Sequence, residues 1–294
     1  DFLSAYLPEQ NHLKLSIDCS NGMANVLIKD LIGEGHNYLF DTLDGTFPNH
    51  EPNPLEEENV SDLKQAVIDS GSDLGIIFDG DADRVMFVDN SGRYIQPDLI
   101  TALLGEYFLK HEQGWVLQDI RTSKSTSEHL EKLGAKVCTW KVGHAYAKLK
   151  MRELNAIFGG ELAGHYYFRD FYCCDSGMLA MLIVLQVTEE LHRKGVTLSD
   201  FIDSIKRYAN SGEMNFHIDD KEAAMEELKQ LYTVEQSPDR VYDIDGYRIE
   251  FDQWWFSVRQ SNTEPYLRLV VEAATEELLQ ARIDELTAVL QQYS

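Results

Sequence analysis

The feature of this sequence that most constrains its fold is a regular alternation of strand-like and helix-like segments. Short apolar runs at 13–19, 74–78 and 115–118 are separated by turns, polar loops and amphipathic stretches. Such alternation is typical of α/β domains, in which helices cover a sheet. From about Gly212 the pattern changes to successive short strands with a hairpin turn at Asp245–Gly246. The sequence therefore predicts an α/β class, with two consecutive α/β domains followed by a C-terminal α+β domain that contains an antiparallel sheet.

Changes in this pattern divide the chain into three predicted domains. A length of 294 residues is enough for two or three domains of ordinary size. The clearest predicted helix starts after Asp175–Ser176, which supplies an N-cap, and ends at Gly195, near the end of the second α/β segment. We place the first α/β domain at 1–111, the second at 112–211 and the α+β domain at 212–294.

The composition excludes several classes of partner. The chain has 26 basic and 50 acidic residues, a formal net charge of −24, so it repels polyanions and nucleic acid is not an expected partner. No apolar run approaches the roughly 20 residues of a membrane-spanning helix, so we expect no membrane association. The four cysteines have neither disulfide nor zinc spacing, which favours a reducing, cytoplasmic compartment. The chain begins at Asp1 rather than Met, and we interpret it as a fragment or processed form.

The most informative segment is an acidic turn that follows a buried apolar strand. Asp79, Asp81 and Asp83 are separated by only one small residue each, and Arg84 follows them. Three carboxylates within five residues repel one another unless a cation compensates them, and hard divalent ions prefer oxygen ligands of this kind. We therefore expect the three aspartates to bind Mg²⁺, with Arg84 facing an anion that the metal also holds. The charge pattern alone leaves a solvated acidic turn as the alternative.

A glycine-rich segment at 159–165 follows a short strand predicted at 156–158. Doubly wound domains place ligand loops at such strand ends. Glu161 can accept hydrogen bonds from sugar hydroxyls, and His165 can transfer a proton near neutral pH. A purely structural role for both residues remains open, because a lone Glu and His in such a loop are a weak signal.

A third segment, at 259–265, lies between two predicted strands of the last domain. Arg259, Ser261, Asn262 and Thr263 place a guanidinium, two hydroxyls and an amide in one turn. Such groups bind phosphate, because arginine grips two phosphate oxygens and the turn amides form an anion-binding concavity. The alternative is a hairpin loop with ordinary turn-forming residues and a surface arginine.

Taken together and in this order, the three segments resemble the α-D-phosphohexomutase family. They read Asp-Gly-Asp-Ala-Asp-Arg at 79–84, Gly-Glu-Leu-Ala-Gly-His at 160–165 and Arg-Gln-Ser-Asn-Thr-Glu-Pro at 259–265. The stretch at 159–171, followed by Cys-Asp-Ser-Gly, is most similar to the phosphomannomutase/phosphoglucomutase branch. The resemblance implies a four-domain architecture of which this chain is the second, third and fourth domain. The first domain, which carries a phosphoserine in the family, has no counterpart motif in these residues.

The resemblance also implies roles for individual residues. Mg²⁺ is implied at Asp79, Asp81 and Asp83, beside the phosphoserine of the missing domain. Ala163 stands where the family usually has Ser, so one hydroxyl contact is lost or replaced by water. Arg84 is implied to contact the sugar phosphate or the transferring group, and proton transfer is implied for His165 and His144. Hydroxyl binding is implied for Glu161, and substrate binding in the cleft for Arg121, Lys141 and His165. The non-reacting phosphate is implied to bind Arg259, Ser261, Asn262 and Thr263.

The implied activity is a mutase reaction that interconverts a hexose 1-phosphate and a hexose 6-phosphate. It proceeds through a phosphoserine and a hexose 1,6-bisphosphate, with Mg²⁺ as cofactor and phosphorylated hexoses such as mannose and glucose phosphates as partners. Without the phosphoserine domain we expect this chain to be inactive alone. Two alternatives remain at this point: a non-catalytic Mg²⁺ and phosphosugar binding module, and a metal-dependent phosphatase that uses one of the carboxylates at 79–83 as its nucleophile.

Overall fold

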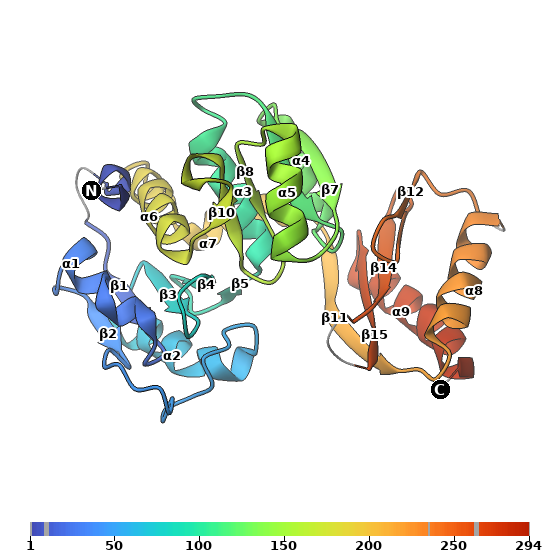
Figure 1. Cartoon of the computed structure of the whole chain (residues 1–294), viewed down its shortest axis with the longest axis horizontal. Helices are drawn as coiled ribbons and strands as arrows, with labels where there is room; N and C mark the ends of the chain where they lie inside the picture. The colour runs from blue at the N-terminus through green and yellow to red at the C-terminus, as the bar shows by residue number, and fades with distance from the viewer. Residues whose placement is uncertain (1, 9–11, 235, 262–264, 294) are drawn as a thin grey trace. The chain divides into compact units, whose positions relative to one another are not determined.

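The structure is a computed structural model that describes residues 2–8, 12–234, 236–261 and 265–293. The chain divides into two compact units, each of which we describe by itself. The first unit contains two sheets and the second contains a third sheet, and Figure 1 shows the course of the chain through them. The first unit comprises residues 1–118, 126–138 and 143–206, and the second comprises residues 119–125, 139–142 and 207–294.

The first sheet has the strand order β2-β1-β3-β4-β5. Strand β1 pairs in parallel with β2 and β3, whereas β3 with β4 and β4 with β5 are antiparallel. Every residue of β3 is buried, which agrees with its continuous apolar sequence and with a central position in the sheet. The strands are β1 (Leu15–Asp18), β2 (Asn37–Leu39), β3 (Leu74–Phe78), β4 (Val85–Asp89) and β5 (Tyr94–Ile95).

The second sheet has the strand order β10-β9-β8-β6-β7. Strands β6 and β8 are parallel, and β8, β9 and β10 follow one another in antiparallel pairs. Gly159 and Gly160 belong to β8, so the predicted strand at 156–158 begins later and includes the glycines that were expected in a loop. The strands are β6 (Trp115–Asp119), β7 (Lys136–Trp140), β8 (Phe158–Gly160), β9 (Tyr166–Phe168) and β10 (Cys174–Asp175).

One continuous apolar core joins the two sheets of the first unit. Helices α3 and α6 pack against each other, and both are buried along most of their length because their sequences are apolar on nearly every side. Figure 1 shows α6, in yellow, next to the first sheet, where it contacts β4. The helices of this unit are α1 (Ile28–Ile32), α2 (Ser61–Ser70), α3 (Pro97–Phe108), α4 (Lys124–Lys132, of which residues 124 and 125 fall in the second unit), α5 (His144–Leu154), α6 (Gly177–Arg193) and α7 (Leu198–Ile205).

The third sheet is antiparallel throughout, with the strand order β11-β15-β14-β13-β12. Helices α8 and α9 pack on it around a second apolar core that includes Phe256, Leu269 and Leu286. The elements are β11 (Ala209–His217), α8 (Lys221–Val234), β12 (Arg240–Asp243), β13 (Tyr247–Glu250), β14 (Trp254–Gln260), β15 (Tyr266–Ala273) and α9 (Glu276–Leu290).

A buried arginine, Arg248, holds the short segment 119–125 by hydrogen bonds within the second unit. Arg248 is only 1% exposed and its guanidinium lies 3.7 Å from the ring centre of Trp255. It donates hydrogen bonds to the backbone carbonyls of Ile120, at 2.9 Å, and Thr122, at 2.5 Å. These contacts fix the backbone on either side of Arg121, one of the predicted substrate-binding residues.

The fold class predicted from the sequence is confirmed: two α/β sheets precede a C-terminal antiparallel sheet with its own helices. Helix α7 was not expected, although Thr197 caps it and Leu198, Ile202 and Ile205 line its buried side. Its eight residues are too few for the periodicity to stand out. Among the described residues, no helix is both long and apolar enough to cross a membrane.

Candidate functional site

The acidic segment forms the tight connection between β3 and β4. Phe78 pairs with Val85 across the two strands, so residues 79–84 make the turn between them. Ala82 has a φ of 64°, a conformation that a small side chain tolerates better than a bulky one. Carboxylate oxygens of Asp79, Asp81 and Asp83 all lie within 4.8 Å of one another. The structure therefore brings the three predicted metal ligands together.

The charges of this turn are only partly balanced by the protein. Asp79 is buried and accepts a 2.7 Å hydrogen bond from Nε of Arg84. Burial raises the pKa of Asp83 to about 6, with the neighbouring carboxylates of Asp79 and Asp81 adding to the effect and His165 opposing it. A divalent cation is a suitable partner for this oxygen-rich donor set, and its charge would favour the ionised form of Asp83.

Two glycines allow the backbone to pack tightly around the acidic turn. A Cβ atom on Gly22 would lie 2.6 Å from the carbonyl oxygen of Gly80, and one on Gly177 would lie 2.8 Å from that of Ala82. Both distances are too short for any residue other than glycine without a backbone shift. Because Gly177 is the first residue of α6, the positive end of that helix dipole begins beside the acidic turn.

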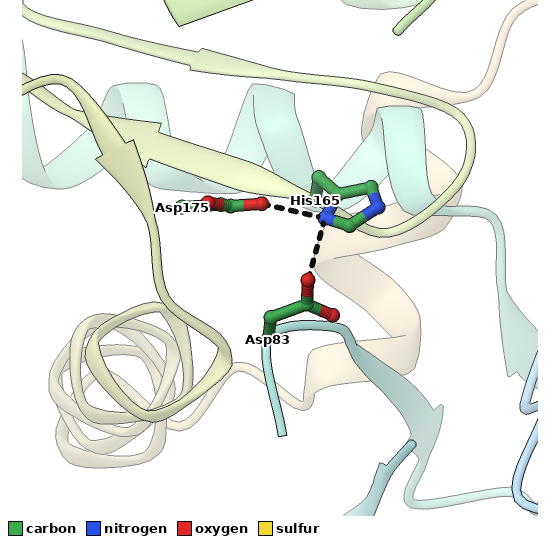
Figure 2. A group of neighbouring side chains, drawn as sticks. All are labelled: Asp83, His165 and Asp175. Carbon is green, nitrogen blue, oxygen red and sulfur yellow. Dashed lines mark ion pairs between the residues drawn. The ribbon is translucent and has the colours of Figure 1, made fainter. Parts of the chain in front are cut away.

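His165 lies next to the acidic turn and is held by a second carboxylate. Figure 2 shows its Nδ1 atom between Asp175 and Asp83, at 2.8 Å and 3.8 Å from their carboxylate oxygens. The contact with Asp175 is an ion pair when the imidazole is protonated. Lys148 pairs with the other oxygen of Asp175 at 2.7 Å.

These pairings set the charge of the histidine. Burial lowers the pKa of His165, but Asp175, Asp83 and Glu161 outweigh this effect and the pKa is raised overall. Burial by itself would raise the pKa of Asp175, but His165 and Lys148 hold it well below its usual range. The imidazole is therefore stabilised as a cation, and Figure 2 shows its other ring nitrogen on the side away from Asp175.

Glu161 is buried near this histidine, and its described partners include two hydrogen-bond donors. The backbone N–H of Gly143 donates to one carboxylate oxygen at 2.6 Å, and the hydroxyl of Tyr167 donates to the other. A carboxylate has about four acceptor positions, so its chemistry suits the recognition of sugar hydroxyls. His144 begins α5, and its ring centre lies 6.2 Å from that of His165. Glu161, His144 and His165 are thus neighbours, as a shared site requires.

A cluster of three arginines forms in the second unit. Arg259 on β14 and Arg268 on β15 are direct cross-strand partners. The carboxylate of Glu213, on β11, contacts Arg268 at 2.8 Å and Arg259 at 3.4 Å. Arg121 contacts the same carboxylate at 3.3 Å and also pairs with Asp119 at 2.8 Å. Two predicted phosphate or substrate ligands, Arg121 and Arg259, are therefore brought together.

Four other residues of the second unit were predicted to bind substrate or phosphate: Lys141, Ser261, Asn262 and Thr263. Lys141 lies in the segment 139–142, which belongs to that unit. The backbone N–H of Ser261 donates to the carbonyl of Tyr266 at 2.9 Å. Asn262 and Thr263 lie outside the described residues.

Five charged residues of these sites were not predicted from the sequence: Asp119, Lys148, Asp175, Glu213 and Arg268. Lys148 follows His144 by four residues on α5, a spacing that places both on one side of a helix and could have drawn attention to it. Asp175 was considered only as part of a helix cap. Glu213 and Arg268 carry no local signal, because their meeting depends on the order of strands in the third sheet.

Comparison with known proteins points to one family. Three models described as phosphoglucomutase/phosphomannomutase match the chain: alpha/beta/alpha domain II at residues 3–92, alpha/beta/alpha domain III at 96–208 and the C-terminal domain at 213–289. A protein from Xanthomonas campestris pv. campestris named "Phosphohexose mutases" is 39% identical over 285 residues, which cover 95% of this chain and 62% of that protein. A phosphomannomutase from Methanocaldococcus jannaschii is 33% identical over 277 residues, covering 93% of this chain and 60% of the other.

The solved structures agree with this result. A phosphoglucomutase/phosphomannomutase family protein from Burkholderia thailandensis superposes with a TM-score of 0.87 at 27% identity. The match covers 99% of this chain and 63% of that structure. The chain thus spans about three fifths of the length of the relatives it matches.

Proposed function

The chain belongs to the phosphoglucomutase/phosphomannomutase family, and on this basis we propose that it is the metal- and phosphosugar-binding part of a phosphohexomutase. The proposed reaction interconverts a hexose 1-phosphate and a hexose 6-phosphate through a phosphoserine and a hexose 1,6-bisphosphate. Mannose and glucose phosphates are the proposed substrates. The observation that carries the proposal is the convergence of Asp79, Asp81 and Asp83 beside His165.

Asp79, Asp81 and Asp83 are the proposed ligands of Mg²⁺. When bound, the ion stabilises negative charge on the oxygens of a phosphoryl group in transfer. Arg84 is close enough to act on the same group, because its Nε is held by Asp79 and its Nη1 lies 3.3 Å from the amide oxygen of Asn53. These contacts orient the guanidinium, which would contact the phosphate of the sugar or the transferring group.

His165 is the proposed acid and base for the sugar hydroxyl. Its Nδ1 atom is held by Asp175, which leaves the opposite ring nitrogen for the substrate. A hydroxyl that attacks a phosphoryl group must lose its proton, and the carboxylates around His165 stabilise the imidazolium that results. In the reverse direction the same imidazolium returns the proton. His144, as the neighbouring imidazole, is a second candidate for proton transfer.

Recognition of the sugar is assigned to residues that do not react. Glu161, fixed by Gly143 and Tyr167, is proposed to accept hydrogen bonds from sugar hydroxyls. In the second unit, Arg259 and Ser261, together with Asn262 and Thr263 of the same motif, are proposed to bind the phosphate that is not being transferred. Arg121 and Lys141 are proposed to contact the substrate.

Separate sites for the reacting and the non-reacting phosphate fit a reaction in which the substrate binds in two orientations. A phosphate site that accepts either end of the hexose bisphosphate permits C1 and C6 to react in turn. The phosphoserine itself is proposed to come from a further domain, as the family resemblance implies, and activity of these residues without it is not expected.

The test is a ³¹P NMR titration of mannose 1-phosphate with this chain in the presence of Mg²⁺. We expect a saturable shift that Arg259→Ala weakens at least about tenfold, because a charged hydrogen-bonding partner is lost. Arg240→Ala, which removes an exposed arginine on β12 of the same unit, should leave the affinity unchanged. Equal binding by the Arg259→Ala variant would contradict the proposed phosphate site.

The same spectra test the phosphatase alternative, and a second experiment with an added phosphoserine domain tests the binding-module alternative. A phosphatase that uses a carboxylate at 79–83 as nucleophile would release inorganic phosphate from mannose 1-phosphate without any bisphosphate primer. A non-catalytic binding module would bind the sugar phosphate but gain no mutase activity when a phosphoserine domain is supplied. No specific observation favours either over the mutase.

A further inference from the structure

We propose that the carboxylate of Glu213 occupies the anion position formed by Arg121, Arg259 and Arg268, and that a phosphate monoester displaces it on binding. The proposal rests on the proposed function, since it concerns the phosphate site of the second unit. It adds Glu213, a residue that belongs to none of the predicted motifs and that competes with the phosphate for the arginines.

The arrangement of strands explains why an anion is needed there. Arg259 and Arg268 stand directly opposite each other on β14 and β15, and like charges in this position destabilise a sheet. Glu213 lies on β11, on the other side of β15, at a register shift between Asn210 and Glu213. The irregularity places an acidic side chain beside two arginines that would otherwise repel each other.

Glu213 contacts all three guanidinium groups with its two oxygens. One oxygen lies 2.8 Å from Nη1 of Arg268, and the other lies 3.3 Å from Nη1 of Arg121 and 3.4 Å from Nη2 of Arg259. Two of the three distances are longer than a well-formed charged hydrogen bond. A flat carboxylate thus only partly satisfies this group of donors, whereas a tetrahedral phosphate offers more oxygens.

Arg259 has a guanidinium that lacks a full set of hydrogen-bond acceptors in the part of the chain that the structure describes. It is 4% exposed, and its Nε is buried with no hydrogen-bond partner among the described residues. Its best side-chain contact is the 3.4 Å pair with Glu213. Burying a charged donor without a full set of acceptors costs free energy, which a better ligand recovers.

The charges around the cluster are balanced as long as Glu213 stays in place. Asp119 pairs with Arg121, and Asp245 lies near enough to Arg259 to interact with it electrostatically. With Glu213, three carboxylates oppose three guanidiniums, so a phosphate dianion gains little net attraction. Once Glu213 moves away, one positive charge is uncompensated and the dianion takes its place.

Glu213 is able to move because it is not fully enclosed. Its side chain is 21% exposed, about as much as the 20% of Arg268, whereas that of Arg259 is 4% exposed and that of Arg121 is 7% exposed. The described contacts of its carboxylate are those with the three arginines. Arg121 and Arg259 therefore form the buried, fixed part of the site, and Glu213 is the part that exchanges.

The test compares the full chain with Glu213→Gln and Glu213→Asp, using mannose 1-phosphate and inorganic phosphate as separate probes. Glu213→Gln should bind each probe about five- to tenfold more tightly, the equivalent of losing one or two partly exposed ion pairs that compete with it. Glu213→Asp, whose carboxylate is retracted, should give a smaller gain in the same direction. Glu222→Gln, an exposed residue on α8, removes the same charge and should change nothing.

Thermal unfolding provides a second readout that does not depend on the sugar. Without ligand, Glu213→Gln should melt at a lower temperature than the wild type, since the arginines lose their counterion. Adding inorganic phosphate should raise the melting temperature of the variant more than that of the wild type.

If Glu213→Gln bound the probes as weakly as the wild type or more weakly, the proposal would be overturned. Glu213 would then be a structural residue that holds the arginines in place. This failure is distinguishable from failure of the proposed function. In the first case the wild type binds mannose 1-phosphate and Arg259→Ala does not, whereas in the second Arg259→Ala binds as well as the wild type.

Discussion

Nδ1 of His165 lies 2.8 Å from a carboxylate oxygen of Asp175, which is paired in turn with Lys148. The ion pair fixes one ring nitrogen and leaves the other for a substrate. It also counteracts the desolvation that would otherwise favour a neutral imidazole. The protonation state of the proposed acid and base is therefore set by a residue that follows the glycine-rich loop by ten positions in the sequence.

The first prediction concerns this pair. Replacing Asp175 with Asn removes the nearest negative charge, so the pKa of His165 should fall, because the burial that lowers it then acts with less opposition. The measurement is an NMR pH titration of the histidine side chains, with His165→Gln identifying the resonance. Asp30→Asn, at an exposed position on α1, is the control. An unchanged titration in Asp175→Asn would show that Asp175 does not set the charge of His165.

The second prediction concerns Mg²⁺ and pH. The pKa of Asp83 is raised to about 6, so this carboxylate becomes protonated as the pH falls through that value and can no longer bind a cation. Calorimetric titration with MgCl₂ should therefore show weaker binding at pH 5 than at pH 7. Asp83→Asn should weaken binding at pH 7 by at least about tenfold and flatten its pH dependence. A variant with unchanged Mg²⁺ affinity would remove Asp83 from the metal site.

The third prediction concerns the close approach of α6 to the acidic turn. A Cβ atom at position 177 would lie 2.8 Å and 3.1 Å from the carbonyl oxygens of Ala82 and Arg84, so Gly177→Ala forces the backbone apart. We expect a loss of about 1 to 3 kcal/mol in the free energy of unfolding, together with weaker Mg²⁺ binding. Gly35→Ala, which has open space around it, should cost far less in chemical denaturation. Equal stability of the two variants would argue against the tight packing.

The fourth prediction concerns His50, a half-buried histidine in the unit that contains the first sheet. Nε2 of His50 lies 3.2 Å from the carboxylate of Asp18, and its Nδ1 donates to the carbonyl of Glu51 at 2.9 Å. The hydrogen bond to Asp18 raises the pKa of His50, although burial opposes it. A raised pKa in the folded state contributes stability below the unfolded value of about 6.5, and the contribution is lost as the pH rises through the folded value.

The corresponding measurement is urea denaturation of the wild type and His50→Gln at several pH values from 6 to 8. The wild type should lose more stability than the variant over this interval, because only the wild type gives up the charged pair. Parallel pH dependence in the two proteins would mean that His50 and Asp18 do not form this pair.

Much of the site is predictable from sequence where its residues are neighbours in the chain. The turn at 79–84 collects its carboxylates within six residues, so any hairpin between two buried strands brings them together. The contact between His165 and Asp83 is harder to foresee. It depends on an isolated pairing between Arg84 and His165, which joins the two loops across 81 residues of sequence.

The arginine cluster shows the limit of such prediction. Arg259 belongs to a recognisable phosphate motif, but Arg268 and Glu213 face it only because β15 lies between β11 and β14. Local hydrophobic patterns predict that these strands exist but do not determine their order or register. The charges that set the electrostatics of the cluster therefore become visible only in the folded structure.

We propose that these residues carry out the mutase reaction when a phosphoserine domain is present. The most direct test is ³¹P NMR of mannose 1-phosphate incubated with Mg²⁺, a hexose 1,6-bisphosphate primer and a protein that joins these 294 residues to the phosphoserine domain of a family member. We expect conversion into mannose 6-phosphate, and we expect Asp83→Asn and Arg259→Ala each to abolish or strongly reduce it. Release of inorganic phosphate without mannose 6-phosphate would contradict the proposal.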